Sequence, residues 1–146
     1  MKSFLDKLFG LEGRVAAITG GGGYLCSEMA RGLAKAGCKI AVMDIRGHKA
    51  KDVAEDIIDC IGAEAIGLEI DASDKNSFTH GLDQTLATFG RADILINGAG
   101  INAPTPFLDI TIDEFNDVMK SQVTSTLLGC QVFGRHMLDQ GKGSII

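Results

Sequence analysis

The residues with the clearest chemistry form a glycine-rich turn, Gly20-Gly21-Gly22-Gly23, which follows the apolar run Val15 to Ile18. Helix-forming sequence begins directly after the turn. A strand, a glycine turn and a helix N-terminus together bind anions, because the first backbone N–H groups of a helix lack partners and glycines let a phosphate approach closely. The turn therefore predicts a phosphate site. The residues assigned to it are Gly20, Gly22, Gly23, Tyr24 and Leu25.

Three further groups of residues end predicted strands. Asp44 follows the glycine turn by roughly 20 residues, where a carboxylate accepts hydrogen bonds from an adenosine ribose. Asp71 ends the next strand and is suited to the amino group of adenine. Asn97-Gly98-Ala99-Gly100 follows the fourth strand, where small residues let a ligand lie against the backbone and the Asn97 amide can link neighbouring strand ends. The residues assigned to this dinucleotide site are Asp44, Ile45, Asp71, Ala72, Asn97, Ala99 and Gly100.

The charge at the second strand end indicates which dinucleotide binds. The Asp44 carboxylate favours NAD over NADP, because it repels a 2′-phosphate on the ribose. Arg46 lies close by in the sequence and keeps NADP as the alternative. Each feature also has a plain structural interpretation, as a tight turn, a solvated strand end or a turn dipeptide. The order and spacing of the four features together favour the dinucleotide.

The elements that must position these residues alternate short β-rich runs with helical patterns, as in right-handed βαβ units. The predicted strands are Arg14 to Thr19, Lys39 to Asp44, Ala65 to Ile70 and Asp93 to Asn97. Apolar spacing predicts three intervening helices that face the sheet through Met29 and Leu33, through Val53, Ile57 and Ile61, and through Phe78, Leu82, Leu86 and Phe89. The pattern predicts an α/β fold with a Rossmann-like, doubly wound parallel sheet.

A fourth helix begins at the capping box Thr111-Ile112-Asp113-Glu114 and is predicted to continue to about Leu138. Gly141 supplies a left-handed stop, and Ser144-Ile145-Ile146 reads as a fifth strand that has just begun. We therefore expect residues 1–146 to form a single domain that is truncated at the start of its fifth strand. Residues 1–11 are expected to form a short docking helix.

Composition excludes several classes of function. The net charge is −5 and no long Lys/Arg run occurs, which argues against a nucleic-acid partner. No apolar run approaches the roughly 20 residues of a membrane-spanning helix, so no membrane role is predicted. The four cysteines, Cys26, Cys38, Cys60 and Cys130, lack metal-ligand spacing and lie in apolar contexts. They predict reduced, packed thiols in a cytoplasmic protein, with no metal site.

The chain resembles the short-chain dehydrogenase/reductase superfamily. The motifs that carry the resemblance are Thr19 to Leu25, Asp44, Asp71-Ala72, Asn97 to Gly100 and Glu114 to Met119. The resemblance implies hydride transfer between a nicotinamide and a hydroxyl or carbonyl carbon of a small-molecule substrate. Within the superfamily, Gly20 to Leu25 and Asn97 to Pro104 look most like the branch of sugar-acid oxidoreductases. The resemblance also implies a homo-oligomer that pairs through the fourth helix.

The chain departs from the family pattern at three positions. Tyr24 and Cys26 occupy two glycine positions, and we expect re-aimed or weakened cofactor contacts, with a negative φ at Tyr24, its ring turned outward, and Cys26 packed between helix and strand. Gln122 aligns with an asparagine that helps to build a proton relay. Either it preserves a relay through water, or it is an ordinary helix residue.

No catalytic residue is assigned. The family's Ser and Tyr-x-x-x-Lys motif falls beyond Ile146, and the only tyrosine, Tyr24, is followed four residues later by Glu28. A tyrosine general acid/base requires a nearby lysine to lower its pKa. We therefore expect the cofactor-binding half of an NAD-dependent oxidoreductase that is inactive alone.

Two alternatives stay open. One is a non-catalytic nucleotide-binding or dimerisation module, and the other is a Rossmann-like methyltransferase, against which Asn97 to Gly100 argues. The apolar residues of the fourth helix are expected to be covered by the sheet on one side and by a neighbouring helix on the other. These residues are Val118, Val123, Leu127, Leu128 and Val132.

Overall fold

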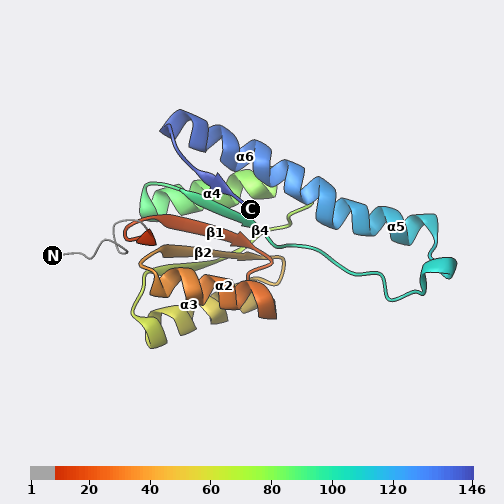
Figure 1. The fold of residues 1–146 in the computed structure, drawn as a ribbon, viewed down its shortest axis with the longest axis horizontal. Coiled ribbons are helices and arrows are strands. Elements are labelled where there is room, and N and C mark those ends of the chain that lie inside the picture. The colour runs from red at the N-terminus through yellow and green to blue at the C-terminus, as the bar shows by residue number, and fades with distance from the viewer. Residues whose placement is uncertain (1–8) are drawn as a thin grey trace.

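The computed structural model describes residues 9–146, which form one parallel sheet between two layers of helices (Figure 1). The predicted docking helix falls largely on residues 1–8, outside the described residues. The strand order is β3-β2-β1-β4-β5, so the order reverses between β1 and β4. The strands are β1 (Val15–Thr19), β2 (Lys39–Asp44), β3 (Ala65–Glu69), β4 (Ile94–Asn97) and β5 (Ser144–Ile145). The predicted doubly wound α/β fold is confirmed.

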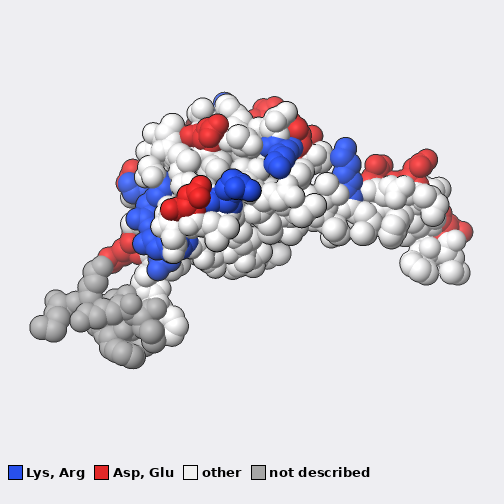
Figure 2. Space-filling model, turned by 90° about the horizontal axis from the view of Figure 1, so that it is seen from above, with Lys and Arg blue, Asp and Glu red and all other residues white. Residues whose placement is uncertain are grey.

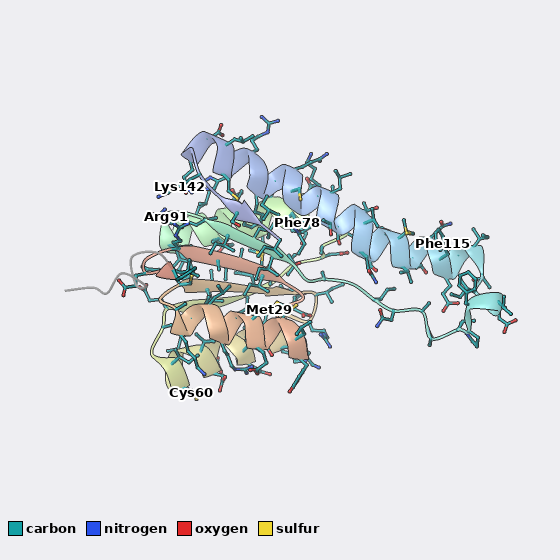
Figure 3. All side chains as sticks on the ribbon, viewed as in Figure 1. Met29, Cys60, Phe78, Arg91, Phe115 and Lys142 are labelled. Atoms are coloured by element: carbon teal, nitrogen blue, oxygen red, sulfur yellow. The ribbon has the colours of Figure 1, made fainter. Side chains whose placement is uncertain are left out.

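Within residues 9–146, two helices cover each face of the sheet. On one face lie α2 (Tyr24–Lys35) and α3 (Gly47–Ile61), and on the other lie α4 (Lys75–Phe89) and α6 (Ser125–Gln140) (Figure 1). Strands β1 and β2 are almost continuously apolar because both of their faces are buried. Phe78 of α4 lies edge-to-face against Phe133 of α6, with ring centroids 6.5 Å apart (Figure 3). These layers hold the strand ends in fixed positions.

The prediction that Met29 faces the sheet is wrong. Met29 is 40% exposed, and the buried residues of α2 are the small ones, Cys26, Ser27, Ala30 and Ala34. Small side chains let the helix pack closely against the sheet directly after the glycine turn. The second and third helices do face the sheet as predicted, through Val53, Ile57, Phe78 and Leu82.

The predicted fourth helix is three consecutive segments along one axis (Figure 1). It begins in α5 (Ile112–Met119), passes through the π-helical segment η2 (Lys120–Thr124) and continues as α6. Thr111 caps it as expected, with its Oγ1 accepting a hydrogen bond of 3.2 Å from the Glu114 N–H. A short 3₁₀ turn, η1 (Phe107–Asp109), precedes it. The π segment widens one helical turn, and no pattern in the sequence indicated it.

The expectations about burial hold for the fourth helix on its sheet side but not for every cysteine. Leu128 and Val132 pack against the core as predicted, while Val123 and Leu127 are each 55% exposed, so their cover by a neighbouring helix stays a prediction. Cys26 and Cys38 are buried, whereas Cys60 is exposed at the end of α3, where its thiol donates a hydrogen bond to Asp56 (Figure 3). The packed thiol predicted at Cys60 is therefore wrong, because position 60 lies on the solvent side of α3.

At the N-terminal ends of β1 and β4, Asp93 joins β1, the segment before β4 and α6. Its Oδ2 accepts hydrogen bonds from the Val15 N–H (3.0 Å) and from Arg91 Nε (2.7 Å), and its Oδ1 accepts one from Gln140 Nε2 (3.3 Å). The residue is fully buried. Burial alone raises the pKa of Asp93, but the bonds from Arg91 and Val15 outweigh it, so the net pKa lies below the ordinary value. The charged form therefore stabilises the fold.

We expect Asp93→Asn to lower the free energy of unfolding by about 2–3 kcal/mol at pH 7, because it leaves Arg91 without its carboxylate partner. A lowered pKa contributes stability above the unfolded-state value, which is about 4, and loses it as the pH falls through the folded-state value. The difference between wild type and variant should therefore shrink as the pH falls below about 4. Urea unfolding measured across this pH range checks it, with the exposed Asp139→Asn as control. A difference that is independent of pH would contradict the assignment.

Candidate functional site

A cavity of about 890 Å³ lies at the C-terminal ends of the strands, and we call it the strand-end cavity. Ten of the twelve residues predicted for the dinucleotide site line it. These are Gly20, Gly23, Tyr24, Leu25, Asp44, Ile45, Asp71, Ala72, Ala99 and Gly100. The other two, Gly22 and Asn97, do not line it and bond to neighbouring elements. The structure thus brings together residues from four separate loops.

The glycine turn has the backbone geometry that its sequence predicts. Gly20 has φ +67°, and a Cβ there would lie 2.7 Å from the Gly98 carbonyl oxygen. Gly23 is the N-cap of α2 and offers no side-chain cap. The helical hydrogen bonds begin with the Ser27 N–H, which donates to the Gly23 carbonyl at 2.9 Å. The N–H groups of the three residues before Ser27 therefore precede the hydrogen-bond ladder, as a phosphate site requires.

The two unusual residues of this turn behave as expected. No described residue other than glycine has a positive φ, so Tyr24 takes an ordinary backbone conformation, and its side chain is 89% exposed. Cys26 is buried, and its thiol donates a weak hydrogen bond to the Gly98 carbonyl at 3.8 Å. A Cβ added at Gly98 would collide with the Cys26 sulfur. Cys26 stands at one of the two positions where the family pattern has glycine. Its thiol still lets α2 pack closely against the loop after β4.

Asp44 ends β2 with its carboxylate turned toward the glycine turn. Its Oδ2 accepts a hydrogen bond of 3.0 Å from the Gly22 N–H, and its Oδ1 accepts bonds from the N–H (2.9 Å) and Nε (3.0 Å) of Arg46. Burial raises the pKa of Asp44, but the hydrogen bonds from Arg46 and Gly22 more than offset that effect and hold it below the ordinary value. Asp44 is therefore ionised at neutral pH. The sequence did not indicate any of these three bonds.

Asp71 lines the same cavity from the loop after β3. Its Oδ1 accepts hydrogen bonds of 2.8 Å from both the N–H and the hydroxyl of Ser73. These two bonds lower its pKa, and the nearby charge of Lys120 adds a smaller effect. Its own N–H donates to Ser77 Oγ at 2.8 Å. The loop is thus held from both sides, and Asp71 stays exposed at the cavity wall.

Thr19 is a positioning residue that the sequence reasoning did not assign to the site. Its buried Oγ1 accepts hydrogen bonds from the N–H groups of Gly98 (3.1 Å) and Ala99 (3.2 Å). It fixes the loop after β4 against the end of β1. The sequence feature that could have indicated this role is that Thr19 is the single polar residue of β1 and ends an otherwise apolar strand.

Asn97 links strand ends as predicted. Its Nδ2 donates to the Ile146 carbonyl at 3.3 Å, and its own N–H donates to the same oxygen at 2.8 Å. Its Oδ1 is buried without a partner and lies against Gly129 of α6, where a Cβ would collide with it. The amide therefore holds β4 against β5. The small residues that follow, Gly98 to Gly100, line the cavity.

Gln122 fastens the cavity loop to the π segment. Its Nε2 donates to the Ile101 carbonyl at 2.8 Å, while the Ile101 N–H donates to the Ser121 hydroxyl at 3.2 Å. A Cβ at Gly100 would lie 2.9 Å from the Gln122 Cγ, so that contact is close. In the wider turn of η2, the consecutive residues Ser121 and Gln122 both bond to Ile101 in the loop after β4. The relay suggested for Gln122 stays a prediction, and its amide nitrogen has a structural role.

Residues 9–146 contain no group of three or more His, Cys, Asp or Glu side chains placed to hold a metal ion. No helix in that part of the chain is long and apolar enough to cross a membrane.

The sequence that forms this cavity, strand order and glycine turn also matches a known protein family. The family model for short chain dehydrogenases matches residues 14–146. The chain belongs to the short-chain dehydrogenase family. The sequence resemblance is thereby confirmed, and an oxidoreductase family is established.

Individual members of the family agree with this assignment. An uncharacterized oxidoreductase UxuB of Bacillus subtilis is 35% identical over 93% of this chain and 54% of its own length. The 2-dehydro-3-deoxy-D-gluconate 5-dehydrogenase of Escherichia coli is 34% identical over 94% of this chain and 53% of its own length. The structure of a 7α-hydroxysteroid dehydrogenase complexed with NADH superposes with a TM-score of 0.89 at 29% identity, over 98% of this chain and 55% of that one. The chain spans about half the length of the curated relatives it matches.

Proposed function

We propose that this short-chain dehydrogenase chain binds NAD(H) in the strand-end cavity and is the cofactor-binding half of an oxidoreductase. The observation that carries the proposal is the ionised, buried Asp44 beside a glycine turn whose helix N–H groups are free. A buried carboxylate at this strand end suits ribose hydroxyls, and free N–H groups suit a pyrophosphate. The 7α-hydroxysteroid dehydrogenase that it resembles was solved with NADH.

Each predicted residue has a part in this proposal. The N–H groups of Tyr24 and Leu25, with Gly20 and Gly23, hold the pyrophosphate, and Gly22 ties this turn to Asp44. Asp44 accepts hydrogen bonds from the adenosine ribose, and the adenine lies between Ile45 and the pair Asp71-Ala72. Ala99 and Gly100 form the nicotinamide side, and Asn97 supports them through the hydrogen bond from its amide to the Ile146 carbonyl. The close approach of Gly20 to Gly98 supports the fit, because a side chain at either position would collide with protein atoms and push apart the two loops that line the cavity.

The reaction proposed for the whole protein is hydride transfer to or from a carbon that bears a hydroxyl or carbonyl group. When bound, the nicotinamide supplies or accepts that hydride. The similarity to a 2-dehydro-3-deoxy-D-gluconate dehydrogenase supports a sugar acid as the substrate class. The chain's own tyrosine, Tyr24, has Glu28 rather than Lys four residues later, so we propose that residues 1–146 bind the cofactor without turnover.

We also propose that copies of the chain associate through the fourth helix. Ile112, Phe115, Met119, Val123 and Leu127 recur at helical spacing and are each 40–74% exposed, and we call them the apolar stripe. No residue from 101 to 124 is buried, and Phe115 lies far out on the projecting helix (Figure 3). Figure 2 shows acidic groups near the far end of the projecting segment and largely uncharged surface beneath them. An apolar stripe of this length on a helix is typical of an interface.

For cofactor binding, we expect NADH at roughly one hundred times its Kd to raise the free energy of unfolding by about 2.7 kcal/mol. Asp44→Asn should weaken NADH binding at least roughly tenfold, because hydrogen bonds to a charged acceptor are worth about 1.5–3 kcal/mol. Thermal unfolding with and without NADH measures both. The control is Asp52→Asn on the exposed side of α3. Stabilisation by S-adenosylmethionine instead of NADH would contradict the proposal and favour a methyltransferase.

For association, we expect Leu127→Glu to shift the chain toward monomer, because it places a charge in the apolar stripe. The matched control is Met29→Glu, an apolar residue on α2 at the opposite face of the sheet that is likewise partly exposed. Sedimentation velocity over a range of protein concentrations measures the oligomeric state of each. A wild-type chain that stays monomeric at every concentration would refute the interface.

A further inference from the structure

Four large apolar side chains line the strand-end cavity and remain exposed. Tyr24, Leu25, Ile45 and Ile101 are each more than half exposed, and all four belong to the cavity wall. They come from the start of α2, the loop after β2 and the loop after β4. Exposed apolar side chains around a concave polar site are typical of a surface that a ligand covers. Tyr24 is the most exposed of the four, and the proposed function uses only its N–H group.

The backbone of Tyr24 is held in place, whereas its ring is not. Tyr24 is the first residue of α2, directly after the N-cap Gly23. Its carbonyl oxygen accepts a hydrogen bond of 2.9 Å from the Ser27 hydroxyl, to which Arg31 Nη1 donates at 3.1 Å. Within residues 9–146, no hydrogen bond holds the phenol. The ring can therefore change its rotamer without disturbing the glycine turn.

The place of Tyr24 in its helix sets the direction of the ring. Every Cα–Cβ bond of an α-helix is tilted toward the helix N-terminus, so a long side chain covers the turn that precedes its own Cα. For Tyr24 that segment is the glycine turn, where the free N–H groups suit a pyrophosphate. Gly22 of the same turn is bonded to Asp44, the proposed acceptor for the ribose. The ring is thus next to the pyrophosphate and the adenosine ribose of a dinucleotide bound there.

We propose that the Tyr24 ring closes over the bound dinucleotide and slows its release. The ribose carbons offer apolar surface, and packing against them buries a ring that is exposed before binding. The phenol hydroxyl stays toward solvent and takes no part. The inference rests on the proposed binding of NAD(H) in the strand-end cavity. It gives Tyr24 the opposite effect to the weakened contacts expected from its place at a glycine position of the family pattern.

The first test compares the release of NADH from wild type, Tyr24→Val and Tyr24→Phe by stopped-flow fluorescence. Tyr24→Val removes the ring and should raise both the dissociation rate constant and Kd roughly tenfold, with the association rate constant changed less than about threefold. Tyr24→Phe keeps the ring and should stay within about threefold of wild type. Met29→Val alters an exposed residue of α2 outside the cavity and, as the matched control, should release NADH like wild type.

A second probe, ADP, locates the contact. ADP lacks the nicotinamide but keeps the two phosphates and the adenosine ribose, so Tyr24→Val should raise its Kd by the same factor in calorimetry. The chain contains one tyrosine and no tryptophan, so its tyrosine emission reports on Tyr24 alone. We expect saturating ADP to lower the quenching of this emission by acrylamide, because the ligand then covers the ring. This readout uses the wild-type chain and does not depend on how the variants fold.

The outcomes separate this inference from the proposed function. If wild type binds NADH and Tyr24→Val releases it at the same rate or more slowly, the inference is wrong while the proposed function stands. Equal weakening in Tyr24→Val and Tyr24→Phe would assign the effect to the hydroxyl and would also overturn it, as would unchanged acrylamide quenching at saturating ADP. If wild type binds neither NADH nor ADP, the proposed function fails and this inference fails with it.

Discussion

The structure depends on the close approach of two backbone segments, at Gly20 after β1 and Gly98 after β4. A Cβ on Gly20 would lie 2.7 Å from the Gly98 carbonyl, and one on Gly98 would collide with the Cys26 sulfur. Neither loop can therefore carry a side chain at this point. The strand order reverses between β1 and β4, so their loops diverge beyond the contact and open the strand-end cavity. The rest of the site is arranged around that contact.

Side-chain hydrogen bonds join the loops that line the cavity to one another and to the long helix. The Thr19 hydroxyl holds the loop after β4, and the Asp44 carboxylate holds Gly22 of the glycine turn. Gln122 and Ser121 fasten Ile101 to the π segment of the long helix. Each of these bonds joins residues at least 20 positions apart in the sequence. The cavity is therefore a product of the whole fold, and its shape is set before any ligand binds.

The parts of the fold that could be predicted are those whose residues meet a local requirement. The apolar strands β1 and β2, the glycine turn and the cap at Thr111 each follow from short-range patterns. Met29 was misassigned because α2 faces the sheet through small residues, which an apolar-periodicity argument overlooks. The π segment and the Asp44–Gly22 bond depend on contacts that appear only once the chain is folded. The same holds for Arg46, whose importance lies in its pairing with Asp44.

The central claim is that a nicotinamide dinucleotide binds in the strand-end cavity. The most direct test is a titration of the isotopically labelled chain with NADH, followed residue by residue through its backbone amide NMR signals. The account predicts that the largest shifts fall on Gly22, Tyr24, Leu25, Cys26 and Ala99, whose N–H groups belong to the glycine turn, the first turn of α2 and the loop after β4. Absence of shifts at saturating NADH, or shifts confined to the apolar stripe of the long helix, would contradict it.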